Sequence, residues 1–169
     1  LVRTALRNAY ELGGVYLLDE MDAGNAGVLT ILNAITANDV AGFPDDTISR
    51  HTDFICIAAG NTYGQGANRQ YVGRQQLDAA TTNRFIGIDW DYDERMEEFL
   101  GKSQPDWTLF VWSLRKAAEK TGIKRIFGTR QIQQGTAMLD DGISLEEVKA
   151  ETVFFGVPVD EKAKLLANI

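Results

Sequence analysis

The stretch Gly13-Gly14-Val15-Tyr16-Leu17-Leu18-Asp19-Glu20-Met21-Asp22 decides the fold class of this chain. Its four apolar residues, Val15 to Leu18, follow a glycine pair without alternation, which predicts a strand buried on both faces of a parallel sheet. Asp19 and Glu20 come next, at the carboxyl end of the strand, where open α/β sheets bind ligands. One carboxylate could hold Mg²⁺ beside nucleotide phosphates, and the other could orient or deprotonate water. The alternative is a core strand that ends in solvated acids.

Two further apolar runs predict parallel strands over residues 54–59 and 86–90. Asn61 follows the first of these runs, so a polar side chain again stands at the carboxyl end of a strand. The long segments between the three runs are sufficient for the crossover connections that parallel strands require. The sequence therefore predicts an α/β fold with its polar side chains at one edge of a sheet.

Helical spacing of apolar residues predicts a helix over residues 2–12 and another that begins after Asn25 as its N-cap. The polar residues 38–52 predict an excursion that contains a hairpin, with Thr47 to Arg50 as one arm. The residues expected on the inward face of the second helix are Val28, Leu29, Leu32 and Ile35.

The glycine-rich segment 60–73 predicts a loop, and residues 75–83 predict a short helix that leads to Arg84 and the third strand. Gly64-Gln65-Gly66 lacks the third glycine of a dinucleotide-binding motif, and no helix opens there, so a phosphate cradle is the weaker interpretation.

From about residue 91 the strand patterns end and only helical patterns follow, which predicts an α/β part over residues 1–90 and an all-helical part over 91–169. The predicted helices cover residues 93–101, 106–121, 128–140, 144–155 and 158–168. The expected buried stripe of the second of them is Trp107, Phe110, Val111, Leu114 and Ala118.

Composition restricts the possible functions. The chain has 169 residues, of which 17 are basic and 24 acidic, and its net charge of −7 argues against broad binding to nucleic acid or anionic membranes.

A single cysteine, Cys56, excludes an intrachain disulfide and favours a reducing compartment, the cytoplasm; its apolar setting predicts a core role. His51 is interpreted as a solvated loop residue. Because Leu1 already falls within a helical pattern, we expect the sequence to be part of a longer protein.

Four motifs occur along the sequence in the order Asp19-Glu20, Asn61, Arg84 and Arg130. Their order and spacing resemble those of AAA+ ATPases of the MoxR, dynein-related and cobaltochelatase ATPase-subunit branch. The run ending in Asp19-Glu20 resembles the Walker B motif, and the run ending in Asn61 resembles sensor 1. Leu77 to Phe85, which contains Arg84, is similar to the stretch that carries the arginine finger, and Gly128-Thr129-Arg130-Gln131 resembles the sensor 2 helix. The resemblance implies part of a P-loop NTPase core over residues 1–90 and a helical lid over 91–169.

The resemblance also implies a role for each residue. Asp19 would bind Mg²⁺, Glu20 would be the general base, and Asn61 would position the attacking water or sense the γ-phosphate of ATP. Arg84 would act on the site of a neighbouring subunit and Arg130 would contact the nucleotide of its own. Structural alternatives are that Asn61 satisfies backbone groups at a strand end and that Arg84 forms a surface ion pair. Arg125 is a second candidate for the role of Arg130.

The sequence departs from the family in one respect: it contains no Gly-x-x-x-x-Gly-Lys-Ser/Thr, the P-loop that binds the β- and γ-phosphates. In the family the P-loop strand lies between the sensor 1 strand and the last strand, so a gap is expected in this sheet. An upstream segment, a different closure of the sheet or a strand from another copy could fill it.

The resemblance implies a homo-oligomeric ring, a hexamer, that uses ATP to remodel or activate a partner protein. Remodelling of a von Willebrand-type protein, metal chelation into a tetrapyrrole with a chelatase component, and phage DNA handling would all suit this branch, although the client itself is not encoded in any motif. The rival hypothesis is an assembly or scaffold module that keeps the fold without hydrolysing ATP.

Overall fold

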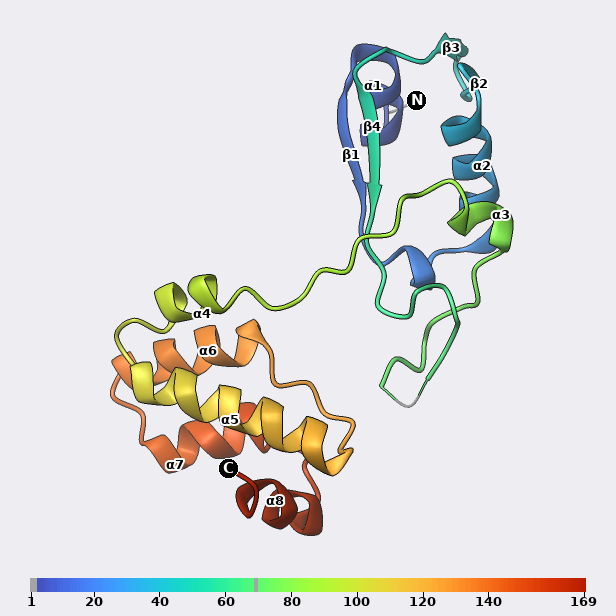
Figure 1. Cartoon of the computed structure of the whole chain (residues 1–169). Coiled ribbons are helices and arrows are strands. Elements are labelled where there is room, and N and C mark those ends of the chain that lie inside the picture. The colour runs from blue at the N-terminus through green and yellow to red at the C-terminus, as the bar shows by residue number, and fades with distance from the viewer. Residues whose placement is uncertain (1–2, 69) are drawn as a thin grey trace. The chain divides into compact units, whose positions relative to one another are not determined.

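A computed structural model describes residues 3–68 and 70–169. The chain divides into two compact units, Leu1–Ile88 and Asp89–Ile169, which are described separately below. The first unit combines helices with short strands, and the described elements of the second are all helical (Figure 1).

The centre of the first unit is a pair of parallel strands, β1 (Gly14–Leu18) and β4 (Phe54–Ala58). Gly14 lies opposite Phe54 and Leu18 opposite Ala58, so the two strands end at the same level. The prediction of parallel strands is confirmed for this pair. Helix α1 (Ala5–Leu12), which begins with the Thr4 hydroxyl accepting a hydrogen bond from the Arg7 N–H, packs against both strands (Figure 1).

The remaining elements of the first unit connect and flank these strands. Asn25 caps helix α2 as predicted, because its side chain accepts a hydrogen bond of 2.8 Å from the Gly27 N–H. The predicted hairpin is also present, since β2 and β3 pair antiparallel. The bounds are η1 (Met21–Ala23), α2 (Ala26–Ala37), β2 (Val40–Gly42), β3 (Thr47–Ser49) and α3 (Ala79–Thr82).

The core of the first unit is built around Tyr10, which is fully buried. Its ring lies 5.7 Å from the ring of Phe43 and 5.2 Å from that of Phe54, and its hydroxyl donates to the Asn38 carbonyl at 2.8 Å. The polar end of the buried side chain therefore has a partner, as buried tyrosines require. The other buried members of this cluster are Ile35, Ala41 and Ile48.

The prediction that the strands are buried on both faces is wrong. Val15 and Leu17 of β1 and Ile55 and Ile57 of β4 are each about half exposed, and the register places them on one face of the pair. Within the described part of the unit no further strand or helix covers this face. Val28 is likewise exposed, whereas the other three predicted inward residues of α2 are buried.

The predicted third strand is also absent: residues 86–90, all of them described, adopt no regular structure. Ile86, Ile88 and Trp90 are strongly exposed. An apolar run becomes a strand only when another strand supplies hydrogen bonds to its backbone, and the described residues offer none here. The preceding helix is shorter than predicted, because α3 covers only Ala79–Thr82.

The second unit consists of helices, as the sequence predicts. They are α4 (Glu94–Leu100), α5 (Pro105–Thr121), α6 (Thr129–Asp140), α7 (Leu145–Val148), the π-helical turn η2 (Lys149–Val153) and α8 (Val159–Leu166). Among the residues that the structure describes, no helix has both the length and the apolar character needed to cross a membrane.

Helix α5 supplies the centre of the second core. Four of the five residues of its predicted stripe are buried, and Phe110 packs against them while remaining partly exposed. The indole N–H of Trp107 donates to the Gln131 carbonyl of α6 at 3.1 Å. Gly135 of α6 permits this close approach, because a Cβ atom at that position would lie 2.2 Å from the Trp107 ring.

We predict that Gly135→Ala destabilises the second unit although alanine is the better helix former. The added methyl group overlaps the Trp107 ring, and overpacking of this kind lowers the free energy of unfolding by about 1–3 kcal/mol. Gln134→Ala, at the neighbouring exposed position of the same helix, is the control and should stay within about 0.5 kcal/mol of wild type in urea unfolding. Equal stability of the two variants would contradict this packing.

Candidate active site

The carboxyl ends of β1 and β4 form one continuous polar edge. Beyond the strands, the Ala59 N–H donates to the Leu18 carbonyl at 2.9 Å, and the Met21 N–H donates to the Ala59 carbonyl at 2.8 Å. These bonds hold the two segments that follow the strands beside each other. Asp19-Glu20 and Asn61, predicted from separate runs of sequence, are thereby brought to the same edge of the sheet.

The backbone turns sharply at the acid pair. Glu20 has φ +53° and ψ +42°, the left-handed conformation, which costs a residue with a side chain about 1–2 kcal/mol. Its N–H donates to Asp19 Oδ1 at 2.9 Å. Both carboxylates are exposed at this turn. They are therefore accessible to a ligand, and neither belongs to the core.

A third acid, Asp22, is the buried centre of this edge, with 1% of its surface exposed. Its Oδ2 accepts hydrogen bonds from the Asn61 N–H at 2.9 Å and from the Thr62 hydroxyl at 2.8 Å. Its backbone carbonyl accepts from the Gln75 N–H at 2.7 Å. Asp22 thus links the segment after β1 by hydrogen bonds to two parts of the loop that follows β4, at residues 61–62 and at Gln75.

The electrostatics of Asp22 favour its charged form. Burial alone would raise the pKa of Asp22, but the hydrogen bonds from Thr62 and Asn61 and the positive charge of Arg74 outweigh it. The pKa of Asp22 therefore lies below its ordinary value of 3.8. The carboxylate is ionised at neutral pH while it is inside the protein.

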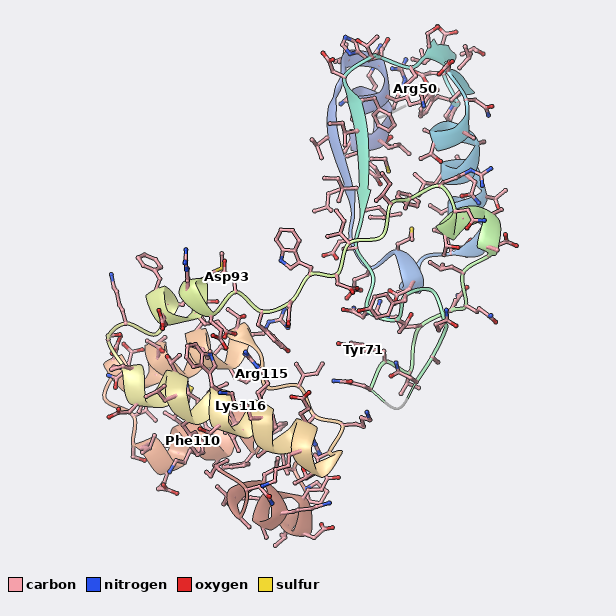
Figure 2. All side chains as sticks on the ribbon, in the orientation of Figure 1. Arg50, Tyr71, Asp93, Phe110, Arg115 and Lys116 are labelled. Atoms are coloured by element: carbon pink, nitrogen blue, oxygen red, sulfur yellow. The ribbon has the colours of Figure 1, made fainter. Side chains whose placement is uncertain are left out.

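Arg74 connects the buried acid to the predicted base. Its Nη2 donates to Glu20 Oε1 at 3.2 Å, and its Nη1 lies 3.4 Å from Asp22 Oδ1. Arg74 comes from the loop before α3, on which Tyr71 is labelled in Figure 2, and its guanidinium lies over the Tyr71 ring at 5.9 Å from the centroid. The site thus contains a cation beside two carboxylates.

Asn61 and Arg84 are placed differently from each other. The Asn61 backbone is bound to Asp22, while its side chain is exposed at the polar edge and so could face a ligand. Arg84 lies just after α3, and its Nη1 donates to the Ala80 carbonyl of its own helix. We expected Arg84 at the start of a strand; it instead extends the end of a short helix, because residues 86–90 form no strand.

Arg130 belongs to the second unit, where it is exposed in the first turn of α6. Arg125, the second candidate for the same role, is occupied: its Nη2 donates to the Gly156 carbonyl at 2.7 Å and its Nε lies 3.4 Å from Glu161. Of the two arginines, Arg130 is the one left facing solvent, which favours it as a ligand contact.

A buried acid also organises the start of α6. Glu97, fully buried in α4, accepts hydrogen bonds from Arg115 at 2.6 Å and 3.1 Å, from the Trp112 indole at 2.7 Å and from the Thr129 hydroxyl at 2.8 Å. Burial would raise the pKa of Glu97, but these donors together hold it below its ordinary value. Arg115, labelled in Figure 2, also donates to the Phe127 carbonyl at 2.7 Å. The network fixes the helix start next to Arg130.

Metal binding by protein groups alone has no candidate in residues 3–68 and 70–169, since no three His, Cys, Asp or Glu side chains gather there. A Mg²⁺ ion that bridges nucleotide phosphates needs only one or two carboxylates. Asp19, exposed beside the strand end, has the donor chemistry for that smaller task.

Sequence reasoning missed Asp22, Arg74 and Glu97 as organising residues. Asp22 could have been noticed, because it follows the acid pair in the same run of sequence, four residues after the end of β1. Arg74 carried none: it lies in a polar loop, 54 residues from Glu20 along the chain. Glu97 is one of several acids in α4, and no local pattern distinguishes the buried one.

The chain was compared with models of known protein families and with curated proteins, and neither comparison gave a match.

We predict that Asp22→Ala lowers the free energy of unfolding by about 2–4 kcal/mol, because it leaves the buried donors of Asn61 and Thr62 and the Arg74 charge without their acceptor. Asp53→Ala, at an exposed acid of the same unit, should change it by less than about 0.5 kcal/mol. Urea unfolding at pH 7 measures both.

Wild type and Asp22→Ala also test the pH dependence of stability. Since the pKa of Asp22 is depressed in the folded protein, its contribution is complete above the ordinary value of 3.8 and is lost as pH falls through the lower folded value. Wild type should therefore lose more stability than Asp22→Ala when pH is lowered from about 5 to 2. Parallel acid profiles for these two proteins would contradict the assignment.

Proposed function

We propose that this chain is part of an AAA+ ATPase of the MoxR, dynein-related and cobaltochelatase ATPase-subunit branch, which binds and hydrolyses ATP to remodel or activate a partner. The observation that carries the proposal is the common edge at which the parallel strands bring Asp19-Glu20 and Asn61 together. Ligands of open α/β sheets bind at such an edge. The exposed Arg130 at a helix start in the second unit agrees with a lid that contacts nucleotide.

In this proposal each side chain has a distinct task. Asp19 holds Mg²⁺, which neutralises charge on the phosphates, Glu20 accepts the proton of the attacking water, and Asn61 orients that water. Arg130 contacts the nucleotide from the second unit. Positioning and electrostatic stabilisation supply most of the catalysis of phosphoryl transfer, so small displacements of these groups should matter.

The proposal requires a P-loop, which these 169 residues do not contain. The half-exposed apolar face of β1 and β4 supports the idea that further polypeptide covers this face, because an uncovered face of four large aliphatic residues is unfavourable in water. We use the term restored protein for residues 1–169 joined to an upstream segment that carries a P-loop strand.

A scaffold module that does not hydrolyse ATP is the second candidate. One observation favours it: the Arg84 guanidinium is engaged by the carbonyl of its own helix. This contact occupies a group that hydrolysis would use. ATPase measurements on the restored protein distinguish the two candidates, because a scaffold would bind partners without turnover.

We predict that residues 1–169 alone show no steady-state ATPase activity, since no P-loop holds the phosphates.

In the restored protein, Glu20→Gln should lower the hydrolysis rate about 10²–10⁴-fold, the usual contribution of a general base, and leave ATP affinity within about threefold. Phosphate release and equilibrium binding of a fluorescent ATP analogue measure the two quantities.

Asp19→Ala is the matched comparison, because it should weaken Mg²⁺-dependent nucleotide binding as well as hydrolysis. If Glu20→Gln lost binding and hydrolysis to the same extent, Glu20 would be a structural residue and the assignment of the base would be wrong.

We also propose that Arg84 acts on a neighbouring subunit of a ring, and we predict complementation between variants. Removal of an arginine finger slows hydrolysis about 10³–10⁵-fold, or about 4–7 kcal/mol of barrier, so Glu20→Gln and Arg84→Ala restored proteins should each be nearly inactive. When the two are mixed, some interfaces combine an intact Glu20 with an intact Arg84, and activity should partly return. Mixtures that exchange subunits but remain inactive at every ratio would show that Arg84 does not act in trans.

A further inference from the structure

We propose that Arg74 is a positioning residue that holds the Glu20 carboxylate in one orientation, and that buried Asp22 anchors the Arg74 guanidinium for this purpose. The inference rests on the ATPase function proposed above, in which Glu20 is the general base. It adds a residue from the loop after β4 that acts through Glu20.

Burial decreases along the series of contacts from Asp22 through Arg74 to Glu20. Asp22 is 1% exposed, the Arg74 side chain 12% and the Glu20 side chain 62%. The buried acid fixes the cation, and the cation reaches outward to the exposed acid. Only the last member of the chain is free enough to need positioning.

Glu20 needs a partner because an exposed glutamate has several accessible rotamers, and restricting them carries an entropic cost of up to about 2 kcal/mol. A general base must lie within hydrogen-bond reach of the water it deprotonates. The hydrogen bond from Arg74 Nη2 to Glu20 Oε1, 3.2 Å long, occupies one oxygen and leaves Oε2 to accept a proton. The pair therefore restricts the rotamers of Glu20 and leaves a carboxylate oxygen accessible to water.

The part of the loop that carries Arg74 is itself held in place. The next residue, Gln75, donates its N–H to the Asp22 carbonyl at 2.7 Å, and Leu77 donates to the Gly64 carbonyl at 2.9 Å. The Tyr71 ring lies under the guanidinium. Arg74 thus projects from a fixed stretch of backbone, as a positioning residue must.

Arg74 contacts its two acidic partners in different ways. Arg74 Nη1 and Asp22 Oδ1 are both buried and lie 3.4 Å apart, yet neither has a hydrogen-bond partner. The hydrogen bond of the guanidinium goes to the exposed Glu20, so Asp22 holds the charge of Arg74 while Glu20 receives the hydrogen bond.

The kinetic experiment compares Arg74→Met, Arg74→Lys and Arg50→Met in the restored protein. We expect Arg74→Met to lower kcat about 10–100-fold with KM for ATP changed less than about threefold, because misplacement of a catalytic group by about 1 Å has effects of this size. Arg74→Lys should recover part of the loss, since an ammonium group keeps the charge and one hydrogen bond. Arg50, which pairs with Asp39 near the hairpin (Figure 2), is the control and its replacement should leave kcat unchanged.

A spectroscopic experiment on the 169-residue chain reports the contact without any hydrolysis. With ¹³C labels at glutamate carboxyls, Glu20→Gln identifies the Glu20 resonance, which Arg74→Met should shift and Arg50→Met should not. An unmoved Glu20 resonance would overturn the contact, and a moved resonance with unchanged kcat would overturn the positioning role. If the wild-type restored protein binds ATP but does not hydrolyse it, the proposed function fails, and this inference fails with it.

Discussion

The buried carboxylate of Asp22 is the interaction on which the candidate site depends. It accepts from two consecutive residues after β4, its backbone accepts from the loop before α3, and it faces the guanidinium of Arg74. A carboxylate can be buried in this way only when donors surround it, because an uncompensated buried charge is strongly unfavourable. The compensation has a geometric consequence: every donor to Asp22 belongs to a segment that also carries a candidate functional group, so satisfying one acid aligns the edge of the sheet.

The second unit repeats this solution with different residues. Glu97 is fully buried and collects donors from α5 and from the first residue of α6. Its role is to set where α6 begins, and the exposed Arg130 follows directly after Thr129. In both units a buried acid with a depressed pKa contacts a residue that in turn contacts or adjoins an exposed charged residue. In the first unit Arg74 links Asp22 to Glu20, and in the second Thr129 links Glu97 to Arg130. Rigid support of this kind would suit an exposed candidate functional group, because precise chemistry requires fixed side chains.

The apolar runs of the first unit show how far a strand pattern depends on its surroundings. Val15 to Leu18 and Phe54 to Ala58 form strands because each supplies the hydrogen-bond partners of the other. Residues 86–90 have the same apolar character but no neighbouring strand among the described residues, and they remain irregular and exposed. Burial on both faces likewise needs covering layers, and α1 with the core around Tyr10 provides only one. The apolar pattern correctly predicted which residues could form a strand. Whether they did so depended on a neighbouring strand that supplies backbone hydrogen bonds.

The sequence by itself determined the features that depend on neighbouring residues: the helical stripe of α5, the Asn25 cap, the hairpin, and the placement of Asp19-Glu20 and Asn61 directly after strands. Periodicity, capping and turn chemistry act within a few residues, which is why they can be recognised without a structure. The tertiary structure alone decided which acid is buried, that Arg74 reaches Glu20 from 54 residues away, and that Arg125 is occupied whereas Arg130 is exposed. Ion pairs of this kind depend on where the chain returns after a long loop, and no local pattern of residues encodes that path.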